Sequence, residues 1–240
     1  AVNGHARLDV LAEAGVALLE PAGRGVRLTD AGTRLVADAA TILDLLERAE
    51  VGLAATHGAP TGKVRIAAFQ SVTRALIPRA LELLRRHEAL RVEVAQVEPE
   101  RAVPALLAGD FDLVVAEEYP GGPAAVNGAT HREELCRDPM RLAVPPGTRR
   151  VWLRRFSAHA WVMEPAGSAS RQWATAMCRS AGFEPDVRYE SDDLLTHVAL
   201  VAHGHAAAFL PDLAWHGGAS PVPLRPLRGQ HRSLFTLVRP

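Results

Sequence analysis

The first 57 residues of the chain alternate between helical and extended patterns. Apolar residues recur at every fourth position from Val2 to Ala14, as on one face of a helix, and Gly15 ends the pattern. Two short β-type runs follow, on either side of Pro21–Gly25, where the glycines favour a turn. We therefore expect a short helix followed by a β-ribbon, which is the order of the second half of a winged helix-turn-helix.

A long helix is predicted from about Asp30 to about His57, with Thr29 as its N-cap. Its apolar positions are separated alternately by four and three residues, the spacing of a coiled-coil seam. They are Leu35, Ala39, Ile42, Leu46, Ala49 and Leu53. The pattern predicts a dimerisation helix that pairs with a second copy of the chain. The alternative, that the stripe packs on its own domain, stays open because globular helices show the same period.

Strands and helices alternate beyond the break at Gly58–Gly62. The first set comprises strands over 64–69, 91–97 and 112–116 and helices over 73–87 and 101–108. The second comprises strands over 141–144, 160–163, 187–189, 206–210 and 234–238 and helices over 169–180 and 193–202. The first set predicts a parallel, helix-covered sheet, and the second predicts a further α/β half, with Pro145–Gly147 as the expected crossing between the two halves.

Composition mainly argues against certain classes of protein. The formal net charge is zero, so a DNA-binding surface must be local, and residues 1–60 hold five arginines against eight acidic residues. The two cysteines, Cys136 and Cys178, favour reduced, buried thiols, with a redox pair as the alternative. No membrane-length apolar run or signal peptide is visible, which predicts a cytoplasmic protein. The chain begins at Ala1 inside a predicted helix, so we expect that the true start has been lost.

A set of motifs runs through the whole chain in a fixed order. The set comprises Glu13–Glu20, Gly23–Gly32, Gly62–Ile66, Leu76–Pro78, Leu107–Leu113, Val201–Gly204 and Leu210–Pro211. In this order and spacing the motifs closely resemble the LysR-type transcriptional regulators, from the end of the DNA-binding domain onward. Leu19, Pro21 and Ala206 depart from the family's usual residues.

The resemblance implies a DNA-binding transcription regulator that forms a homodimer or homotetramer and senses a small molecule. It implies the end of a winged helix-turn-helix at 1–29 and a linker and dimerisation helix at 30–60. A two-lobed, periplasmic-binding-protein-like effector domain would follow, with lobe I at 61–145 and 225–240 and lobe II at 146–224. The expected partners are operator DNA, a small-molecule effector and a second copy of the chain.

Candidate DNA contacts are side chains with donors for phosphates and base edges. They are Asn3, His5 and Arg7 in the first helix, and Arg24 and Arg27 on the ribbon.

Candidate effector contacts lie where strands end and helices begin, because ligands of open α/β sheets bind at that edge. They are Gln70, Ser71, Thr73, Glu98, Glu100, Ser168, Ser170 and Arg171. We expect Ser71 and Ser168 to face one another across a cleft; the alternative is that both are routine helix caps. Glu98 and Glu100 would repel a purely anionic ligand, which leaves room for one with a cationic group.

Catalytic motifs are missing from the sequence. There is no nucleophile elbow, P-loop or dinucleotide fingerprint after a strand, so we expect neither an enzyme nor a cofactor. His203 and His205 resemble a metal pair but lack an evident third ligand, so we expect no metal. The alternative function is a stand-alone small-molecule (solute) binding protein without DNA recognition.

Overall fold

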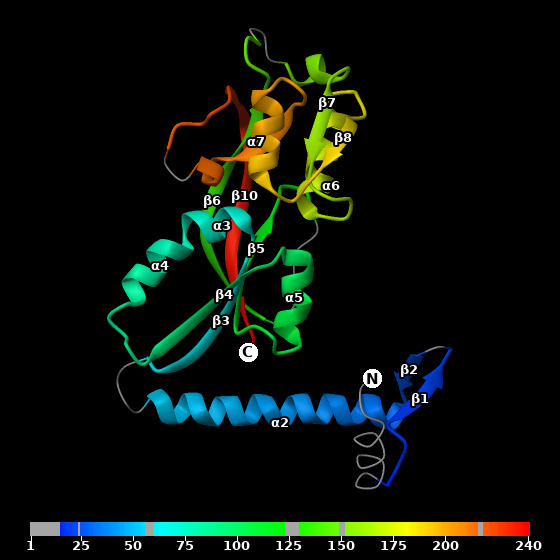
Figure 1. Cartoon of the computed structure of the whole chain (residues 1–240), viewed down its shortest axis with the longest axis vertical. Coiled ribbons are helices and arrows are strands. Elements are labelled where there is room, and N and C mark those ends of the chain that lie inside the picture. Colours follow the sequence, from blue (N-terminus) through cyan, green and yellow to red (C-terminus); the bar gives the residue numbers. More distant parts are fainter. Residues whose placement is uncertain (1–14, 24, 56–59, 123–129, 149–151, 216–217) are drawn as a thin grey trace. The chain divides into compact units, whose positions relative to one another are not determined.

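The computed structural model describes residues 15–23, 25–55, 60–122, 130–148, 152–215 and 218–240. Within helix α2 it leaves out the side chains of residues 40, 43, 44 and 46–55. The chain divides at Pro60 into two compact units, which are described separately (Figure 1). The predicted helix over residues 1–14 lies outside the described residues.

The first unit contains the predicted ribbon and long helix. Strands β1 (Leu19–Ala22) and β2 (Gly25–Leu28) pair antiparallel. Helix α2 (Asp30–Ala55) follows, and Thr29 caps it as predicted, since its hydroxyl accepts a hydrogen bond from the Gly32 amide at 3.0 Å. The same hydroxyl donates to the Ala17 carbonyl at 2.7 Å, so one threonine fastens the ribbon to the helix.

Gly32 has a steric reason to be glycine. A Cβ added at this position would lie 2.1 Å from the backbone oxygen of Leu18, a distance that no side chain tolerates. The first turn of α2 therefore approaches the start of the ribbon at backbone contact distance.

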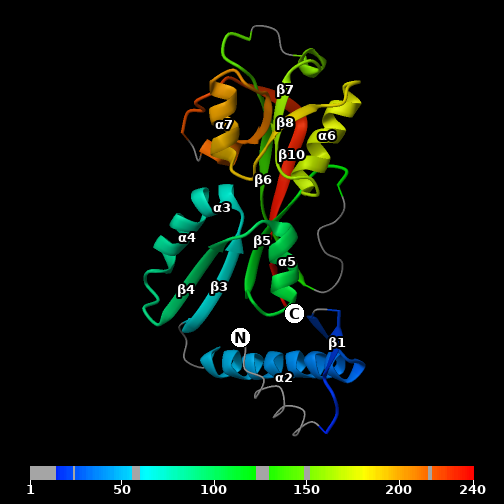
Figure 2. The same cartoon turned by 45° about the vertical axis from the view of Figure 1, so that its right-hand side comes forward.

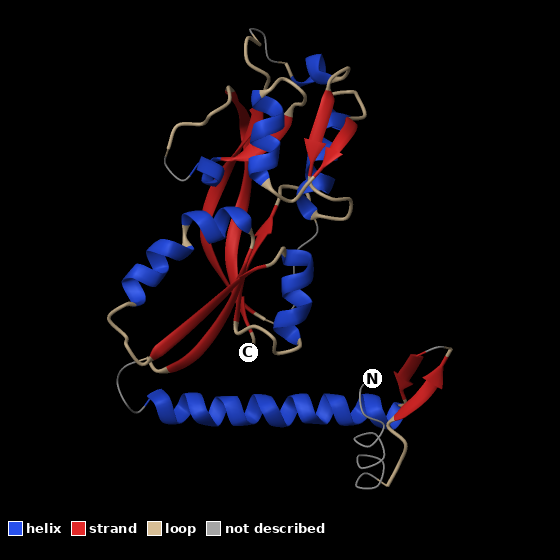
Figure 3. Ribbon diagram, viewed as in Figure 1, coloured by secondary structure: helices blue, strands red, loops and turns tan. Residues whose placement is uncertain are grey.

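The second unit is built on a six-stranded sheet in the order β4-β3-β5-β10-β6-β9 (Figure 3). Its strands are β3 (Gly62–Ala68), β4 (Leu90–Gln96), β5 (Leu113–Glu118), β6 (His131–Ala143), β9 (Ala208–Pro211) and β10 (Leu224–Val238). Two further strands, β7 (Ala160–Met163) and β8 (Asp186–Glu190), pair parallel with each other. A parallel bridge from Trp161 to Ala207 ties β7 to the segment before β9.

The parallel pairing predicted for the first three strands of this unit is confirmed, but the sheet as a whole is mixed. Strands β3, β4 and β5 are parallel, but β10 runs antiparallel to β5 and β6, and β6 runs antiparallel to β9. Both β6 and β10 are also much longer than predicted, and they run from one half of the unit to the other (Figure 2). Polar residues interrupt their apolar patterns, which hid their length in the sequence.

The helices correct a second expectation. The single helix predicted over 73–87 is two helices, α3 (Gln70–Ala75) and α4 (Ile77–Leu84), with the break at Leu76. Pro78 lies in the first turn of α4, where its missing N–H and fixed φ suit a helix start and not a helix interior. The others are α5 (Pro99–Leu107), α6 (Ala169–Ser180), α7 (Leu194–Ala202) and the short 3-10 turns η1 (Leu153–Phe156) and η2 (Asp212–Trp215).

The second unit has two halves, the first containing β3, β4 and β5 with α3, α4 and α5, and the second containing β7, β8 and β9 with α6 and α7. Each half has its own buried core. In the first half, α3 and α5 cover β3 and β5, with Val72 and Leu106 buried against the sheet. In the second half, a cluster around Trp161 and Trp173 joins α6 to β7 and β9. The two halves meet where β5 and β7 end and where α3, α5, α6 and α7 begin.

Candidate functional site

A fully buried arginine stands at the junction of the two halves. Arg232 of β10 is 2% exposed and donates to the Asp138 carboxylate of β6 at 2.7 and 2.9 Å. Its other bonds reach the Glu117 carboxylate at the end of β5 and the Ser71 hydroxyl of α3, both at 2.6 Å. One guanidinium thus connects three strands and a helix.

Burial dominates the electrostatics of this cluster. It raises the pKa of Glu117 and of Asp138, and Arg232 offsets only part of that effect in each case. Burial alone would lower the pKa of Arg232, but the two carboxylates outweigh it and raise that pKa. Tyr119 donates its phenolic O–H to Glu117 at 3.0 Å, and burial followed by this carboxylate raises the pKa of the phenol. Two buried carboxylates, those of Glu117 and Asp138, therefore share the single positive charge of Arg232.

The pKa values of two more carboxyl groups respond to the negative charge of this cluster. Burial, together with the charges of Glu117, Asp192 and Glu100, raises the pKa of Glu98 to about 7. Burial and the charges of Glu117 and Glu98 raise the pKa of Glu164, which follows β7, to about 8. Neither group has an ion-pair partner among the described residues, so each holds a proton for much of the neutral pH range.

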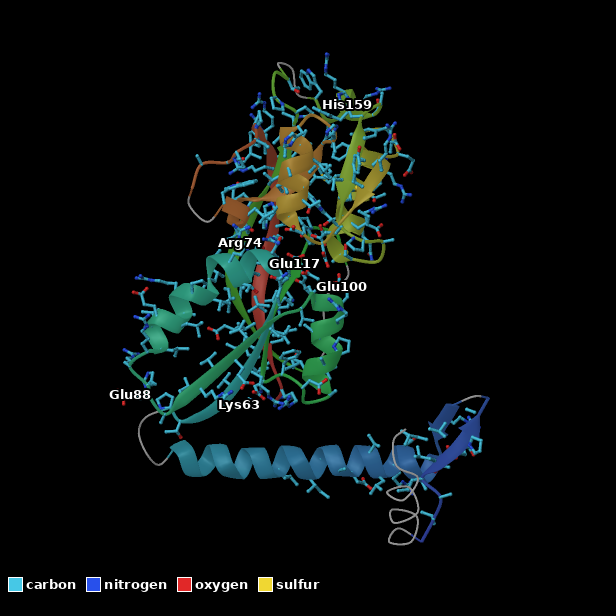
Figure 4. All side chains as sticks on the ribbon, viewed as in Figure 1. Lys63, Arg74, Glu88, Glu100, Glu117 and His159 are labelled. Atoms are coloured by element: carbon cyan, nitrogen blue, oxygen red, sulfur yellow. The ribbon has the colours of Figure 1, made fainter. Side chains whose placement is uncertain are left out.

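Direct hydrogen bonds join the halves at two points. The Gln70 side-chain amide donates to Asp193 at 2.5 Å, and its carbonyl accepts from the Leu194 amide at 2.7 Å. The Glu100 carboxylate accepts from the Ala169 amide at 2.9 Å, which links the start of α5 to the start of α6. Glu100 and Glu117 both lie at this junction in Figure 4.

A cavity of about 410 Å³ opens between α5 and α6. The first turns of α5, the segment Glu117–Gly122 and the face of α6 that carries Ala169 and Trp173 form its wall. The rings of Tyr119 and Trp173 stack at 5.3 Å, and both line the cavity. The volume lies in the range of small-molecule sites.

The structure gathers the predicted effector contacts around this junction. Gln70, Glu98 and Glu100 have the surroundings described above. Ser71 is not a helix cap, because its hydroxyl accepts from Arg232 and α3 begins after Phe69. Ser168 does cap α6, since its hydroxyl accepts from the Arg171 amide at 3.1 Å.

The remaining predicted effector contacts already have partners within the chain. The Thr73 hydroxyl donates to the Ala68 carbonyl at 3.0 Å, and a hydrogen bond from Ser170 lowers the pKa of Glu164 against the effect of burial. Arg171 donates to the Glu164 carbonyl oxygen at 2.9 Å and lies 3.4 Å from Glu190. They hold the edge of the junction together, and a ligand role for them remains a prediction.

The predicted DNA contacts are largely untested by the structure. Asn3, His5, Arg7 and Arg24 lie outside the described residues. Arg27 lies on β2, where its guanidinium pairs with Glu20 at 2.6 Å.

The predicted dimerisation positions are exposed where side chains are described. Leu35 is 47% and Ile42 58% exposed, and Ala39 is exposed as well. The side chains of Leu46, Ala49 and Leu53 are not described. Within the described part of α2, the apolar stripe is thus free to meet another surface.

Sequence reasoning missed the centre of the site. Arg232, Asp138 and Glu117 were not singled out as site residues. All three lie on strands, and a buried arginine needs carboxylates as partners. The partners of Arg232 lie 94, 115 and 161 residues away along the chain, so no local spacing could pair them. Trp173 and Asp193 were missed for the same reason.

Other candidate chemistry finds no support in the described parts of the chain. No group of three or more potential metal ligands occurs among the described residues. Both cysteines are free, and burial raises the pKa of the Cys178 thiol to about 12, which suits a structural thiol. None of the described helices is long and apolar enough to cross a membrane.

Comparison with protein families matches the LysR substrate binding domain to residues 57–240. The chain belongs to the LysR family. A relative in Pseudomonas putida, the HTH-type transcriptional regulator ClcR, is 34% identical over 82% of this chain and 68% of its own length. The probable HTH-type transcriptional regulator LrrA of Synechococcus elongatus is 30% identical over 88% of this chain and 70% of its own length.

Solved LysR structures share the fold of this chain. CbnR, a LysR family transcriptional regulator, superposes with a TM-score of 0.60 at 21% identity, over 98% of this chain and 83% of CbnR. The BenM effector-binding domain with benzoate superposes with a TM-score of 0.57 at 19% identity, over 75% of this chain and 85% of BenM. The predicted α/β effector-domain fold is confirmed at this level.

Family membership also decides the class of function. The relatives are transcription regulators, so the prediction of a LysR-type regulator, and not an enzyme, is confirmed.

Proposed function

We propose that the junction of the two halves is the effector site of this LysR regulator. The observation that carries the proposal is that both halves supply buried polar groups to one place beside a cavity. Arg232 and Asp138 come from the long strands β10 and β6, Glu117 comes from β5, and Glu164 and Trp173 come from the second half. The BenM effector domain, which has the same fold, was solved with benzoate as its effector.

The two hydrogen-bonded links across the junction suggest how binding is transmitted. Gln70 with Asp193, and Glu100 with Ala169, hold the halves in one relative position. A ligand that competes with either link, or bridges the halves itself, favours another position and shifts the population. Since β6 and β10 run through both halves, bending of these strands would absorb the motion.

The remaining assignments follow the domain order of the family. Residues 1–29 are the end of a winged helix-turn-helix, with Asn3, His5, Arg7, Arg24 and Arg27 facing DNA, and 30–60 form the dimerisation helix. Lobe I comprises 61–145 and 225–240, and lobe II comprises 146–224, with β6 and β10 shared near the boundary. The exposed Leu35 and Ile42 support pairing of α2 with a second copy.

A footprint on the DNA flanking the protein's own gene tests this function. The full-length gene product is used, and competitor DNA at near-physiological salt suppresses electrostatic binding. We expect a discrete, roughly two-fold symmetric protected site. If this DNA and a genome-wide binding map both show no site, the chain is a ligand-binding protein without DNA recognition.

A further inference from the structure

The walls of the junction cavity have an unbalanced charge. Three carboxylates line it, those of Glu100, Glu117 and Glu118, and no Lys, Arg or His is among the described residues that line it. Arg132 neutralises Glu118 through two hydrogen bonds of 2.6 and 2.7 Å. Arg232 is shared between Glu117 and Asp138 and can neutralise only one of them. Glu100 accepts only a neutral backbone amide.

The groups around the cavity do not supply the positive charge that its walls lack. Glu98 faces Glu117, Asp192 and Glu100; Arg101 opposes their effect, but the pKa of Glu98 is still raised to about 7. Glu164 faces Glu117 and Glu98, with Arg232 opposing them, and its pKa is raised to about 8. Without a ligand, the site therefore reduces its own repulsion by holding protons.

The other walls suit the body of a small organic cation. The stacked rings of Tyr119 and Trp173 present aromatic surface to the cavity, next to the carboxylates. Aromatic faces attract ammonium and guanidinium groups, and they also pack against apolar stems. A purely apolar or anionic ligand would cover Glu100 without supplying a cation for it, and taking an unpaired carboxylate out of water is costly.

We propose that the effector of this regulator carries a cationic nitrogen, an ammonium or guanidinium group, which binds between Glu100 and Glu117 with its apolar part against Tyr119 and Trp173. This proposal rests on the effector function proposed above and specifies its chemical class. The volume of 410 Å³ limits the ligand to roughly a dozen non-hydrogen atoms, at about 30 Å³ per water-sized group.

Compounds of equal shape and different charge test the proposal. Benzylamine, benzyl alcohol and benzoate are titrated into the full chain at pH 8, and a second trio of pentylamine, pentanol and pentanoate removes the aromatic ring. Ligand-detected NMR reports the dissociation constants. We expect each amine to bind at least about tenfold more tightly than its alcohol and its carboxylate, as charge-assisted contacts predict.

Variants locate the binding. Glu100→Gln keeps an acceptor for the Ala169 amide but removes one charge, and it should weaken the amines about tenfold and leave the alcohols unchanged. Glu184→Gln removes the same charge from an exposed pair with Arg179 outside the cavity, and it should change nothing. Amine affinity should also rise from pH 6 to pH 8, because the bound cation opposes protonation of Glu98 and Glu164.

Three results would overturn the proposal. If the carboxylates bind more tightly than the amines, the ligand is anionic and the effector site itself stands. If no compound of either trio binds, or if the amines bind Glu100→Gln unchanged, the cavity does not select cations. The DNA footprint tests the regulator function independently of these three results.

Discussion

Replacing Arg232 by methionine tests the account of the buried cluster. The side chain is 3% exposed and makes four hydrogen bonds of 2.6 to 2.9 Å to Glu117, Asp138 and Ser71. Methionine fills much of the same volume but leaves two buried carboxylates without a cation. Breaking a buried ion pair from one side costs about 3–5 kcal/mol, so we expect the free energy of unfolding of the second unit to fall by about that amount.

Urea unfolding followed by tryptophan fluorescence measures this loss. All four tryptophans lie in the second unit, so the signal reports that unit alone. The control is Arg188→Met, which breaks an exposed pair with Asp186 and should change the unfolding free energy by less than about 0.5 kcal/mol.

The pH dependence of the stability loss shows whether it comes from the unpaired carboxylate charges or from the changed shape of the side chain. In the variant, Glu117 and Asp138 lose the cation that lowers their pKa values, so the folded state binds protons more readily than the wild type does. The difference in stability between wild type and variant should therefore shrink as the pH falls from 8 to 5, by up to about 1.4 kcal/mol per pH unit for each carboxylate. The triple variant with Glu117→Gln and Asp138→Asn should recover most of the loss. A loss below about 1 kcal/mol, or one independent of pH, would refute the reasoning.

Three further predictions concern other parts of the chain. Gly32→Ala places a Cβ 2.1 Å from the carbonyl oxygen of Leu18, the residue before the ribbon, and should speed hydrogen exchange of the ribbon amides, whereas Gly25→Ala, with 3.7 Å of clearance, should not. Leu35→Glu on the exposed stripe of α2 should convert dimers to monomers in sedimentation experiments, and Ala37→Glu on the opposite face should leave them intact; equal behaviour would rule out the seam. The folded-state pKa of Glu164 is raised from 4.5 to about 8, so wild-type stability should fall as the pH rises through that window. Glu164→Gln should flatten this fall in urea titrations, and an unchanged slope would mean that Glu164 does not hold the proton.

The sequence predicted most of the features that depend on residues close to one another in the chain. The ribbon, the cap at Thr29 and the extent of α2 depend on neighbours within a few residues, and all three were predicted. The break at Leu76 was equally local, because proline is favoured in the first turn of a helix and disfavoured in its interior, and it was overlooked.

The candidate site was predictable at its edges and not at its centre. Gln70, Glu98 and Glu100 were singled out because strand ends collect at one side of a sheet. Arg232 lies in a long antiparallel strand, and its pairing depends on the register of β10 against β5 and β6. That register is set by contacts across the whole second unit, so periodicity along the chain does not reveal it.

A footprint recorded with and without ligand tests the central claim, that the junction site controls DNA binding. The tightest amine of the shape-matched panel is added to the full-length gene product at a concentration that saturates the site. The account predicts that the length of the protected site or its pattern of enhanced cleavage changes. It also predicts that Glu100→Gln requires about tenfold more amine for the same change. A footprint that is identical with the site empty and saturated would contradict the account.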